Sequence, residues 1–306
     1  MPRKKQAAKR KVRKANSQKK TGRKGAARSA TESAQNGEGR FPVVGIGASA
    51  GGLEAIEGFF SHAPANRNVA FVIIQHLASG HKSIMDLLLK RYTEMNVLQI
   101  EDGTKIEPDC IYLNPPDKNV AIIDRRLSLT DPAETRGARL SIDYFFRSLA
   151  DDQGEKAICI ILSGTGTDGT LGLKAIKGAG GMAMVQDEDQ ARYNSMPRNA
   201  IDTGLVDYVL PVEKMFGELM KYVQHPYIGG HVQVPAVKEK SEDYMRKIFL
   251  LIRSKTGHDF SHYKQNTIQR RIERRLAVHQ IDDLGKYTRY LQENEPEVDV
   301  LFSKIS

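Results

Sequence analysis

Between Phe41 and Gln224, short apolar runs alternate with amphipathic stretches, and this alternation constrains the fold more than any other feature. The apolar runs include PVVGIGA, VAFVII, AICIIL and GMAMV, and segments such as LEAIEGFF and LGLKAIKGA lie between them. Continuous apolar strands separated by helices are typical of a parallel sheet that is covered on both faces. We therefore expect an α/β fold: a doubly wound, mainly parallel sheet with helices on both faces.

The runs VLQI, CIYL, VAII and LSLT between Val97 and Thr130 are shorter, and they indicate a β-rich excursion at one edge of that sheet. Residues 225–240 contain two prolines and a Gly-Gly pair, which predicts a linker. Helical spacing continues through 241–306 and predicts a small all-α bundle. The expected organisation is thus a tail at 1–40, an α/β domain at 41–224, a linker and a helical domain.

The positive charge of the chain is concentrated in its first forty residues. The sequence has 46 Lys and Arg and a formal net charge of +9, but residues 1–40 hold 14 of those cations and only two acidic residues. With so few bulky apolar residues, this segment is expected to be disordered. Two interpretations stay open: a solubilising arm, or loose attraction to nucleic acid or an anionic membrane surface without specific recognition.

Other compositional features exclude several classes of protein. No apolar run is long enough to span a bilayer and no signal peptide is recognisable, so we expect a cytoplasmic protein without a transmembrane segment. Cys110 and Cys159 each lie inside an apolar run, which predicts buried thiols. No metal-ligand spacing occurs, and we expect neither a metal nor a cofactor.

The stretch VVGIGASAGG, Val43 to Gly52, fits two functional templates. One is the glycine-rich loop of a dinucleotide-binding oxidoreductase, and the other is a sharp turn that presents Ser49 as a nucleophile. The first template needs an acidic residue about twenty positions further on to bind the ribose hydroxyls. No Asp or Glu lies between Glu57 and Asp86, so the nucleotide hypothesis is disfavoured.

The serine hypothesis requires a base and a group that orients the base. Ser49, His76 and Asp168 each follow a predicted strand, and neighbouring parallel strands bring such residues to one edge of a sheet. His76 would accept the serine proton, and Asp168 would hold the imidazole. Backbone amides near Ala50 and Thr165 are the expected oxyanion donors. Taken singly, each of these residues also has an ordinary structural explanation.

Several sequence blocks together resemble the catalytic domain of the CheB-type protein-glutamate methylesterases, over about residues 41–224. The blocks are GASAGG, IIQH, LNPPDKNVAI, SIDYFFRSLA, ILSGTGTDGTLGLKAIKGAGG and VQDEDQARYNSMPRNAI. The resemblance implies hydrolysis of γ-glutamyl methyl esters on chemotaxis receptors, with deamidation of receptor glutamines in many members. It also implies that Ser49, His76 and Asp168 are the catalytic residues. The sequence departs from the usual family pattern at Ala50, Thr165 and Asn119.

The segment after residue 241 resembles the helical N-terminal domain of the CheR-type receptor methyltransferases. The stretch TIQRRIERRLAVHQ predicts a helix with a basic face that covers an arc of about 140°. The residues of this face are Arg270, Arg271, Arg274 and Arg275. The resemblance favours docking of this face onto acidic receptor helices, and the alternative is a solvated charged surface. The receiver domain typical of the methylesterases and the S-adenosylmethionine-binding domain of the methyltransferases have no counterpart in this sequence. We therefore expect the front part of an esterase–transferase fusion.

Two functions therefore remain. The first is a serine esterase acting on methylated chemotaxis receptors. The second is an adaptor with weak or no catalysis that binds a receptor or a chemosensory kinase through its basic helix.

Overall fold

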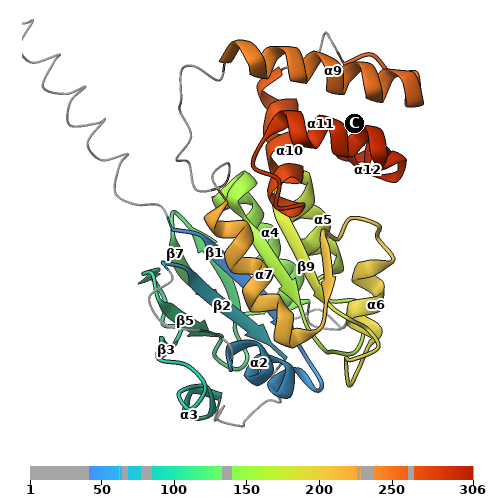
Figure 1. Ribbon diagram of the computed structural model, residues 1–306. Helices are drawn as coiled ribbons and strands as arrows, with labels where there is room; N and C mark the ends of the chain where they lie inside the picture. The colour runs from blue at the N-terminus through green and yellow to red at the C-terminus, as the bar shows by residue number, and fades with distance from the viewer. Residues whose placement is uncertain are drawn as a thin grey trace, which may run out of the picture. The chain divides into compact units, whose positions relative to one another are not determined.

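Figure 1 shows the computed structural model of the chain. The structure describes residues 41–61, 63, 68–76, 85–132, 140–225, 228, 238–260 and 265–305. The tail at 1–40 and most of the linker at 225–240, both expected from the sequence, lie outside the described residues.

The main sheet has seven strands in the order β10-β9-β8-β1-β2-β5-β3, and every neighbouring pair is parallel. The expected doubly wound parallel sheet is confirmed. Its strands are β1 (Val43–Ala48), β2 (Ala70–Gln75), β3 (Asn96–Gln99), β5 (Cys110–Leu113), β8 (Ile158–Ile161), β9 (Met182–Gln186) and β10 (Tyr208–Leu210).

The expected edge excursion divides between two sheets. VLQI and CIYL form β3 and β5 and extend the main sheet, whereas VAII and LSLT belong to a separate antiparallel sheet. That sheet contains β4 (Thr104–Lys105), β7 (Arg126–Thr130) and β6 (Asn119–Ile123) in this order. Periodicity predicted strands at all four runs, but strand pairing is a long-range property that periodicity does not specify.

Helices flank the main sheet and continue beyond it, as Figure 1 shows. Those associated with the sheet are α2 (Gly52–Phe60), α3 (Met85–Leu89), α4 (Ser141–Gln153), the short 3₁₀ turn η1 (Gly154–Lys156), α5 (Thr170–Gly178), α6 (Ser195–Ile201) and α7 (Val212–Gln224). The later helices, which we call the helical module, are α9 (Lys238–Thr256), α10 (Gln265–Val278), α11 (Leu284–Glu293) and α12 (Glu295–Ile305). None of the described helices is both long enough and apolar enough to cross a bilayer.

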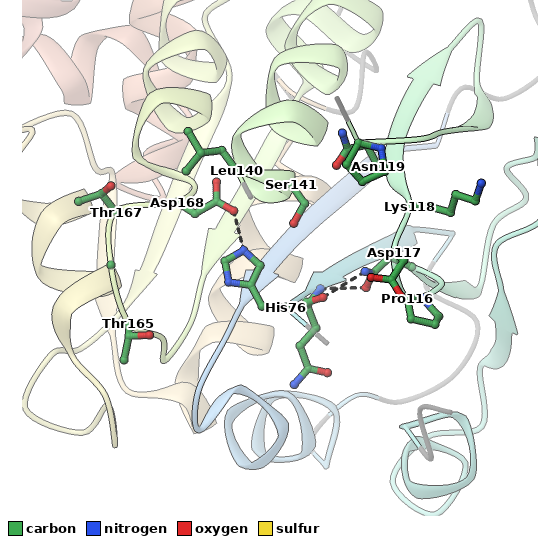
Figure 2. Close-up of a pocket in the computed structure, with 14 residues that line it drawn as sticks. His76, Pro116, Asp117, Lys118, Asn119, Leu140, Ser141, Thr165, Thr167 and Asp168 are labelled. Atoms are coloured by element: carbon green, nitrogen blue, oxygen red, sulfur yellow. Dashed lines mark hydrogen bonds and ion pairs between the residues drawn. The ribbon is translucent and has the colours of Figure 1, made fainter. Parts of the chain in front are cut away.

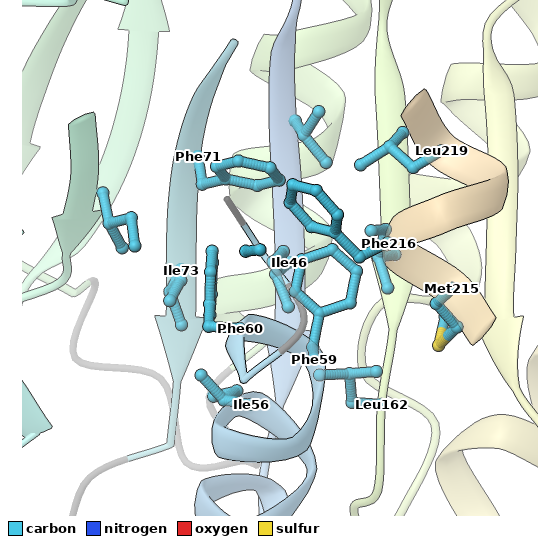
Figure 3. Packing of buried hydrophobic residues seen from close by; sticks show 14 of the residues in the cluster. Ile46, Ile56, Phe59, Phe60, Phe71, Ile73, Leu162, Met215, Phe216 and Leu219 are labelled. Atoms are coloured by element: carbon cyan, nitrogen blue, oxygen red, sulfur yellow. The ribbon is translucent and has the colours of Figure 1, made fainter. Parts of the chain in front are cut away.

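An aromatic cluster fills the space between the sheet and the helices α2 and α7 (Figure 3). The ring centroid of Phe59 lies 5.0 Å from that of Phe60, 5.8 Å from that of Phe71 and 5.5 Å from that of Phe216, all in edge-to-face geometry. Edge-to-face pairs stabilise a core beyond the burial of their area. The cluster joins α2, β2 and α7, so it holds in place the turn between β1 and α2.

Strand β1 faces two different layers with alternate residues, as a pleated strand must. Val44 and Ile46 point into the aromatic cluster, whereas Gly45 and Gly47 face α4. A Cβ at Gly45 would lie 2.9 Å from Phe146, and one at Gly47 would lie 2.4 Å from Ile142. These two glycines of the ambiguous motif therefore allow a helix to pack closely on the strand, which gives them a role without any nucleotide.

The helical module has a core of its own and also contacts the α/β domain. Its core residues are Ile248, Ile252, Phe260, Ile268, Ile272, Leu276, Leu284, Tyr287, Leu291, Val298, Leu301 and Ile305. Ala277 of α10 packs instead into the core of the α/β domain. The Tyr208 hydroxyl donates to the Val278 carbonyl oxygen at 2.9 Å. Helix α10 is therefore shared between two cores.

Candidate functional site

Ser49 lies in a sharp turn between β1 and α2. Its amide donates to the carbonyl oxygen of Ser163 at 3.0 Å, and the amide of Gly52 donates back to the Ser49 carbonyl oxygen at 2.8 Å. Gly51 caps the helix with a φ of 68°, in the left-handed region that glycine adopts without strain. The turn thus holds the Ser49 backbone on both sides, as a nucleophile-presenting turn requires.

His76 follows β2 directly, and its ring reaches the hydroxyl of Ser49. The Nδ1 atom lies 3.1 Å from Ser49 Oγ, and Nε2 lies 2.7 Å from Asp168 Oδ2. The side chain of His76 is 29% exposed, whereas that of Asp168 is 3% exposed. One ring nitrogen thus faces the alcohol and the other faces a buried carboxylate.

The Asp168 carboxylate is held by backbone amides at the starts of α4 and α5. Oδ2 accepts from the amide of Ile142 at 2.9 Å, and Oδ1 accepts from the amides of Asp143 at 2.8 Å and Gly169 at 2.9 Å. The first amides of a helix have no acceptor within the helix, so they suit an anionic partner. Both oxygens are fixed, and with them the ring of His76.

A second buried carboxylate, Asp143, fastens the start of α5 to the start of α4. Its Oδ1 accepts from the amide of Gly172 at 2.6 Å. Burial raises the pKa of Asp143, the hydrogen bond from Gly172 opposes this, and the nearby negative charge of Asp168 raises it further. Asp143 therefore supports the two segments that position Asp168, although it contacts neither His76 nor Ser49 in the described hydrogen-bond network.

A pocket of about 430 Å³ opens beside His76. Figure 2 shows the His76 ring directed at Asp168, with Thr165 and Thr167 on one side and Asn119 and Lys118 across the opening. Its lining residues are Gln75, His76, Asn114, Pro116, Asp117, Lys118, Asn119, Pro132, Leu140, Ser141, Thr165, Gly166, Thr167 and Asp168. The volume lies within the range of small-molecule sites and suits an extended side chain.

The amides of Ala50 and Thr165, which the sequence suggested as oxyanion donors, lie on segments next to Ser49. A Cβ at Gly164 would come within 2.9 Å of the Ser49 Cβ, so the segment that carries Thr165 passes against the serine. The neighbouring amides of Gly164 and Gly166 donate to Tyr193 O and Ser195 Oγ. Among the described residues, the amides of Ala50 and Thr165 donate to no acceptor.

Three polar residues that the sequence did not single out hold this site together. The Asn114 side chain, at the end of β5, accepts from the Gln75 amide at 2.9 Å and donates to the Gln75 carbonyl oxygen at 3.1 Å. The Ser163 hydroxyl donates to Ala50 O at 2.9 Å, and the Ser163 amide donates to Gln186 Oε1 at 2.8 Å. Asn114, Ser163 and Gln186 all stand at strand ends, and that position was the available signal.

The expectation that four arginines of α10 share one exposed basic face is wrong. Arg274 and Arg275 are only 9% and 7% exposed. Arg274 Nε donates to the Tyr222 hydroxyl at 3.1 Å, and Arg275 binds the Glu297 carboxylate through Nε at 2.8 Å and Nη2 at 2.7 Å. The long arginine side chains turn inward because Tyr222 and Glu297 offer buried acceptors, which helical periodicity alone does not reveal.

The two remaining arginines stay accessible to different degrees. The Arg270 side chain is 64% exposed and lies 3.5 Å from the Glu155 carboxylate, whereas Arg271 is partly buried.

Cys110 and Cys159 are buried free thiols, as expected. Within the described residues, no cluster of three or more His, Cys, Asp or Glu side chains is arranged to hold a metal ion.

Comparison with known proteins identifies two family segments. Residues 44–219 match the family model described as CheB methylesterase, and residues 243–306 match the one described as CheR methyltransferase, all-alpha domain. The crystal structure of the Thermotoga maritima CheB methylesterase catalytic domain superposes with a TM-score of 0.55 at 26% identity, covering 60% of this chain and 98% of that one.

Relatives of known sequence extend this picture. A Rhizobium meliloti protein named protein-glutamate methylesterase/protein-glutamine glutaminase of group 3 operon is 35% identical over 56% of this chain and 49% of its own length. A protein-glutamate methylesterase/protein-glutamine glutaminase from Desulfotalea psychrophila is 31% identical over 61% of this chain and 53% of its own length. An uncharacterized 104.1 kDa Rhodobacter capsulatus protein is 34% identical over 70% of this chain, which spans only 24% of it. By fold, by sequence and by the family model that covers more than half of it, this chain belongs to the CheB methylesterase family.

Proposed function

We propose that this chain is a protein-glutamate methylesterase that hydrolyses γ-glutamyl methyl esters of chemotaxis receptors through Ser49, His76 and Asp168. The observation that supports it best is the continuous contact from Ser49 Oγ to His76 Nδ1 and from His76 Nε2 to Asp168. His76 and Asp168 also line an open pocket. Family membership and the names of the relatives support the same reaction.

The first half of the reaction follows from the tautomer of His76. With Nε2 protonated and donating to Asp168, Nδ1 is free to accept the Ser49 proton as Oγ attacks the ester carbonyl carbon. The amides of Ala50 and Thr165 would donate to the oxyanion that forms. Collapse expels methoxide, which takes the proton from His76 and leaves as methanol.

The second half returns the enzyme to its starting state. A water molecule loses a proton to His76 and attacks the acyl-serine, and the Ser49 oxygen recovers that proton when the glutamate side chain departs. The same sequence releases ammonia from a glutamine side chain, and the glutaminase in the names of the relatives supports deamidation as a second activity. Family membership also favours the expected cytoplasmic location.

Replacement of the nucleophile tests this proposal. Ser49→Ala should reduce methanol release from a methylated receptor fragment to background, because no other described hydroxyl contacts the His76 ring. Ser61→Ala is a matched control, since Ser61 is an exposed serine at the far end of the adjoining helix. Thermal unfolding of both variants checks the fold. Turnover retained in Ser49→Ala would reject the mechanism.

The alternative, an adaptor without turnover, makes the opposite prediction. An adaptor would bind its receptor or kinase equally well with and without Ser49, and the wild-type chain would release little or no methanol. Docking through α10 would now depend mainly on Arg270, since Arg274 and Arg275 are buried. The ordered contacts at Ser49 favour the esterase.

A further inference from the structure

Cationic side chains from three helices gather at the end of the main sheet where strands β9 and β10 begin. Ser49 lies at the opposite end, where β1 finishes. These cationic side chains surround a small pocket of about 30 Å³, which we call the arginine pocket. Lys177 belongs to α5, Arg271, Arg274 and Arg275 to α10, and Lys304 to α12; Gly180 and Asp207 complete the lining. Five cations thus face a single carboxylate.

The Asp207 carboxylate already forms ion pairs, and so does the nearby carboxylate of Glu297. Asp207 forms ion pairs with Lys177 and, at 3.8 Å, with Arg275 Nη1. Glu297 accepts two hydrogen bonds from Arg275. Within 4.0 Å, these two carboxylates pair with Lys177 and Arg275 but with none of the other described cations of the lining.

The three other cations have only neutral oxygen acceptors or none. Arg274 donates to the Tyr222 hydroxyl and to the Glu155 carbonyl oxygen, and Lys304 Nζ donates to the Leu205 carbonyl oxygen at 3.0 Å. Among the described residues, no carboxylate lies within 4.0 Å of the charged groups of Arg271, Arg274 or Lys304. Partly buried positive charge without a counter-ion is costly, and an anion would relieve that cost.

The proton affinities of these groups agree with an excess of positive charge. Burial, together with repulsion from Lys177 and Arg275, lowers the pKa of Lys304 to about 8, although the negative charges of Asp207 and Glu297 oppose this shift. Burial and the neighbouring Arg274 lower the pKa of Arg271. Burial is the larger cause for both groups, so both positive charges are poorly solvated, and a bound anion would stabilise them.

We propose that the arginine pocket binds one phosphate-type oxyanion. Guanidinium groups bind such anions through paired N–H donors, and donors that converge from several helices suit a tetrahedral group with several acceptor oxygens. The volume of about 30 Å³ admits only a small group, because a single water molecule needs about 10–15 Å³. The proposed occupant is a free phosphate or the phosphoryl group of a small molecule whose remainder stays outside.

A bound oxyanion would join parts of the chain that are distant in sequence. Lys177 belongs to the α/β domain, whereas Arg271 and Lys304 belong to the helical module, so one anion would bridge both. The site is independent of the esterase proposal, because it lies beside the amino ends of β9 and β10 and His76 follows the carboxyl end of β2.

Calorimetric titration of the whole chain with inorganic phosphate, at ionic strength held constant with sodium chloride, tests the proposal. Arg271→Gln and Lys304→Gln should each weaken binding by about tenfold or more, as expected for loss of a charge-assisted contact. Arg270→Gln is the matched control: it removes a charge from the adjacent, exposed position that does not line the pocket. Its affinity should stay within about twofold of wild type.

The comparison among variants separates the pocket from the basic tail, which is the same in all of them. No phosphate binding by the wild-type chain, or equal binding by the three variants, would overturn the proposal. Thermal midpoints without phosphate verify that each variant is folded. A parallel titration with glycerol 3-phosphate distinguishes the source: tighter binding than phosphate assigns the pocket to a phosphorylated small molecule, and weaker binding assigns it to the free anion.

Discussion

Asp168 and Asp207 are two buried carboxylates at opposite ends of the parallel strands: Asp168 follows the carboxyl end of β8, and Asp207 precedes the amino end of β10. Their partners differ in kind. Their side chains are 3% and 2% exposed. Asp168 accepts from three backbone amides and from His76. Asp207 accepts from the Ala183 amide and is surrounded by the fixed cations Lys177 and Arg275. Equal burial therefore accompanies very different surroundings.

The difference explains what each aspartate can do. The neutral donors around Asp168 leave its charge available to His76, a ring that can take up and release a proton beside an open pocket. Burial opposes ionisation of Asp207, but the charge of Lys177 outweighs it, and the pKa of Asp207 is lowered. An aspartate paired with buried lysine and arginine side chains stabilises a fold, whereas one held by amides and a histidine can support chemistry.

The largest effect should come from Asp168→Asn. We expect kcat for methanol release to fall by about 10³ to 10⁴-fold, because the amide no longer favours the Nε2-protonated tautomer of His76. The variant also sets an amide group against backbone donors, which should cost about 1–3 kcal/mol of unfolding free energy. Steady-state kinetics and urea unfolding measure both. A kcat within tenfold of wild type would contradict the assigned role of Asp168.

Asp207→Asn should give the reverse pattern. Removing one partner of a buried ion pair leaves Lys177 uncompensated and should lower the unfolding free energy by about 3–5 kcal/mol. Below the unfolding transition, kcat should match wild type, since Asp207 is remote from Ser49 along the strands. Asp202→Asn, at an exposed aspartate, is the control and should change neither quantity. A stable Asp207→Asn variant with reduced kcat would break the contrast between the two aspartates.

The smallest effect concerns acid stability at Glu297, whose partner Arg275 also pairs with Asp207. Burial raises the pKa of Glu297, but hydrogen bonds from His279 and Arg275 outweigh burial and hold that pKa at about 2, compared with an ordinary value of 4.5. A depressed carboxyl pKa stabilises the fold above pH about 4.5, and this stability is lost as pH falls toward about 2. The shift corresponds to about 3 kcal/mol.

Urea unfolding of the wild type and of Glu297→Gln as a function of pH measures this contribution. The variant should be less stable at neutral pH and should lose less stability between pH 4.5 and 2. Glu295→Gln is the control, because the Glu295 side chain is 84% exposed. If the unfolding free energies of wild type and Glu297→Gln fell in parallel between pH 4.5 and 2, the Glu297 carboxylate would make no contribution to acid stability.

Local pattern was sufficient for much of the fold and for the candidate site. Continuous apolar runs predicted the parallel strands, and the positions of Ser49, His76 and Asp168 after such runs predicted that they would meet. They do meet, because β8, β1 and β2 are adjacent in the sheet. Asn114, Ser163 and Gln186 escaped prediction because their function depends on which backbone group lies opposite, and that depends on the order of the strands.

The arginines of α10 show the other limit. Ile268, Ile272 and Leu276 recur at helical spacing and lie in the core of the helical module, since burial of apolar side chains is a property that the sequence pattern carries. It could not place the guanidinium groups, because an arginine is flexible enough to reach solvent or an internal acceptor. Only the presence of Tyr222, Glu297 and Glu155 decided that Arg274 and Arg275 turn inward.

The sequence by itself determined the strands and helices, the core of the α/β domain and the residue types available for serine chemistry, because these follow from periodic burial and from side-chain identity. The tertiary structure alone decided how each charge is compensated. It set amides around Asp168, cations around Asp207, and an excess of positive charge in the arginine pocket. Electrostatic interactions depend on distances between groups that are far apart along the chain, and only folding fixes those distances.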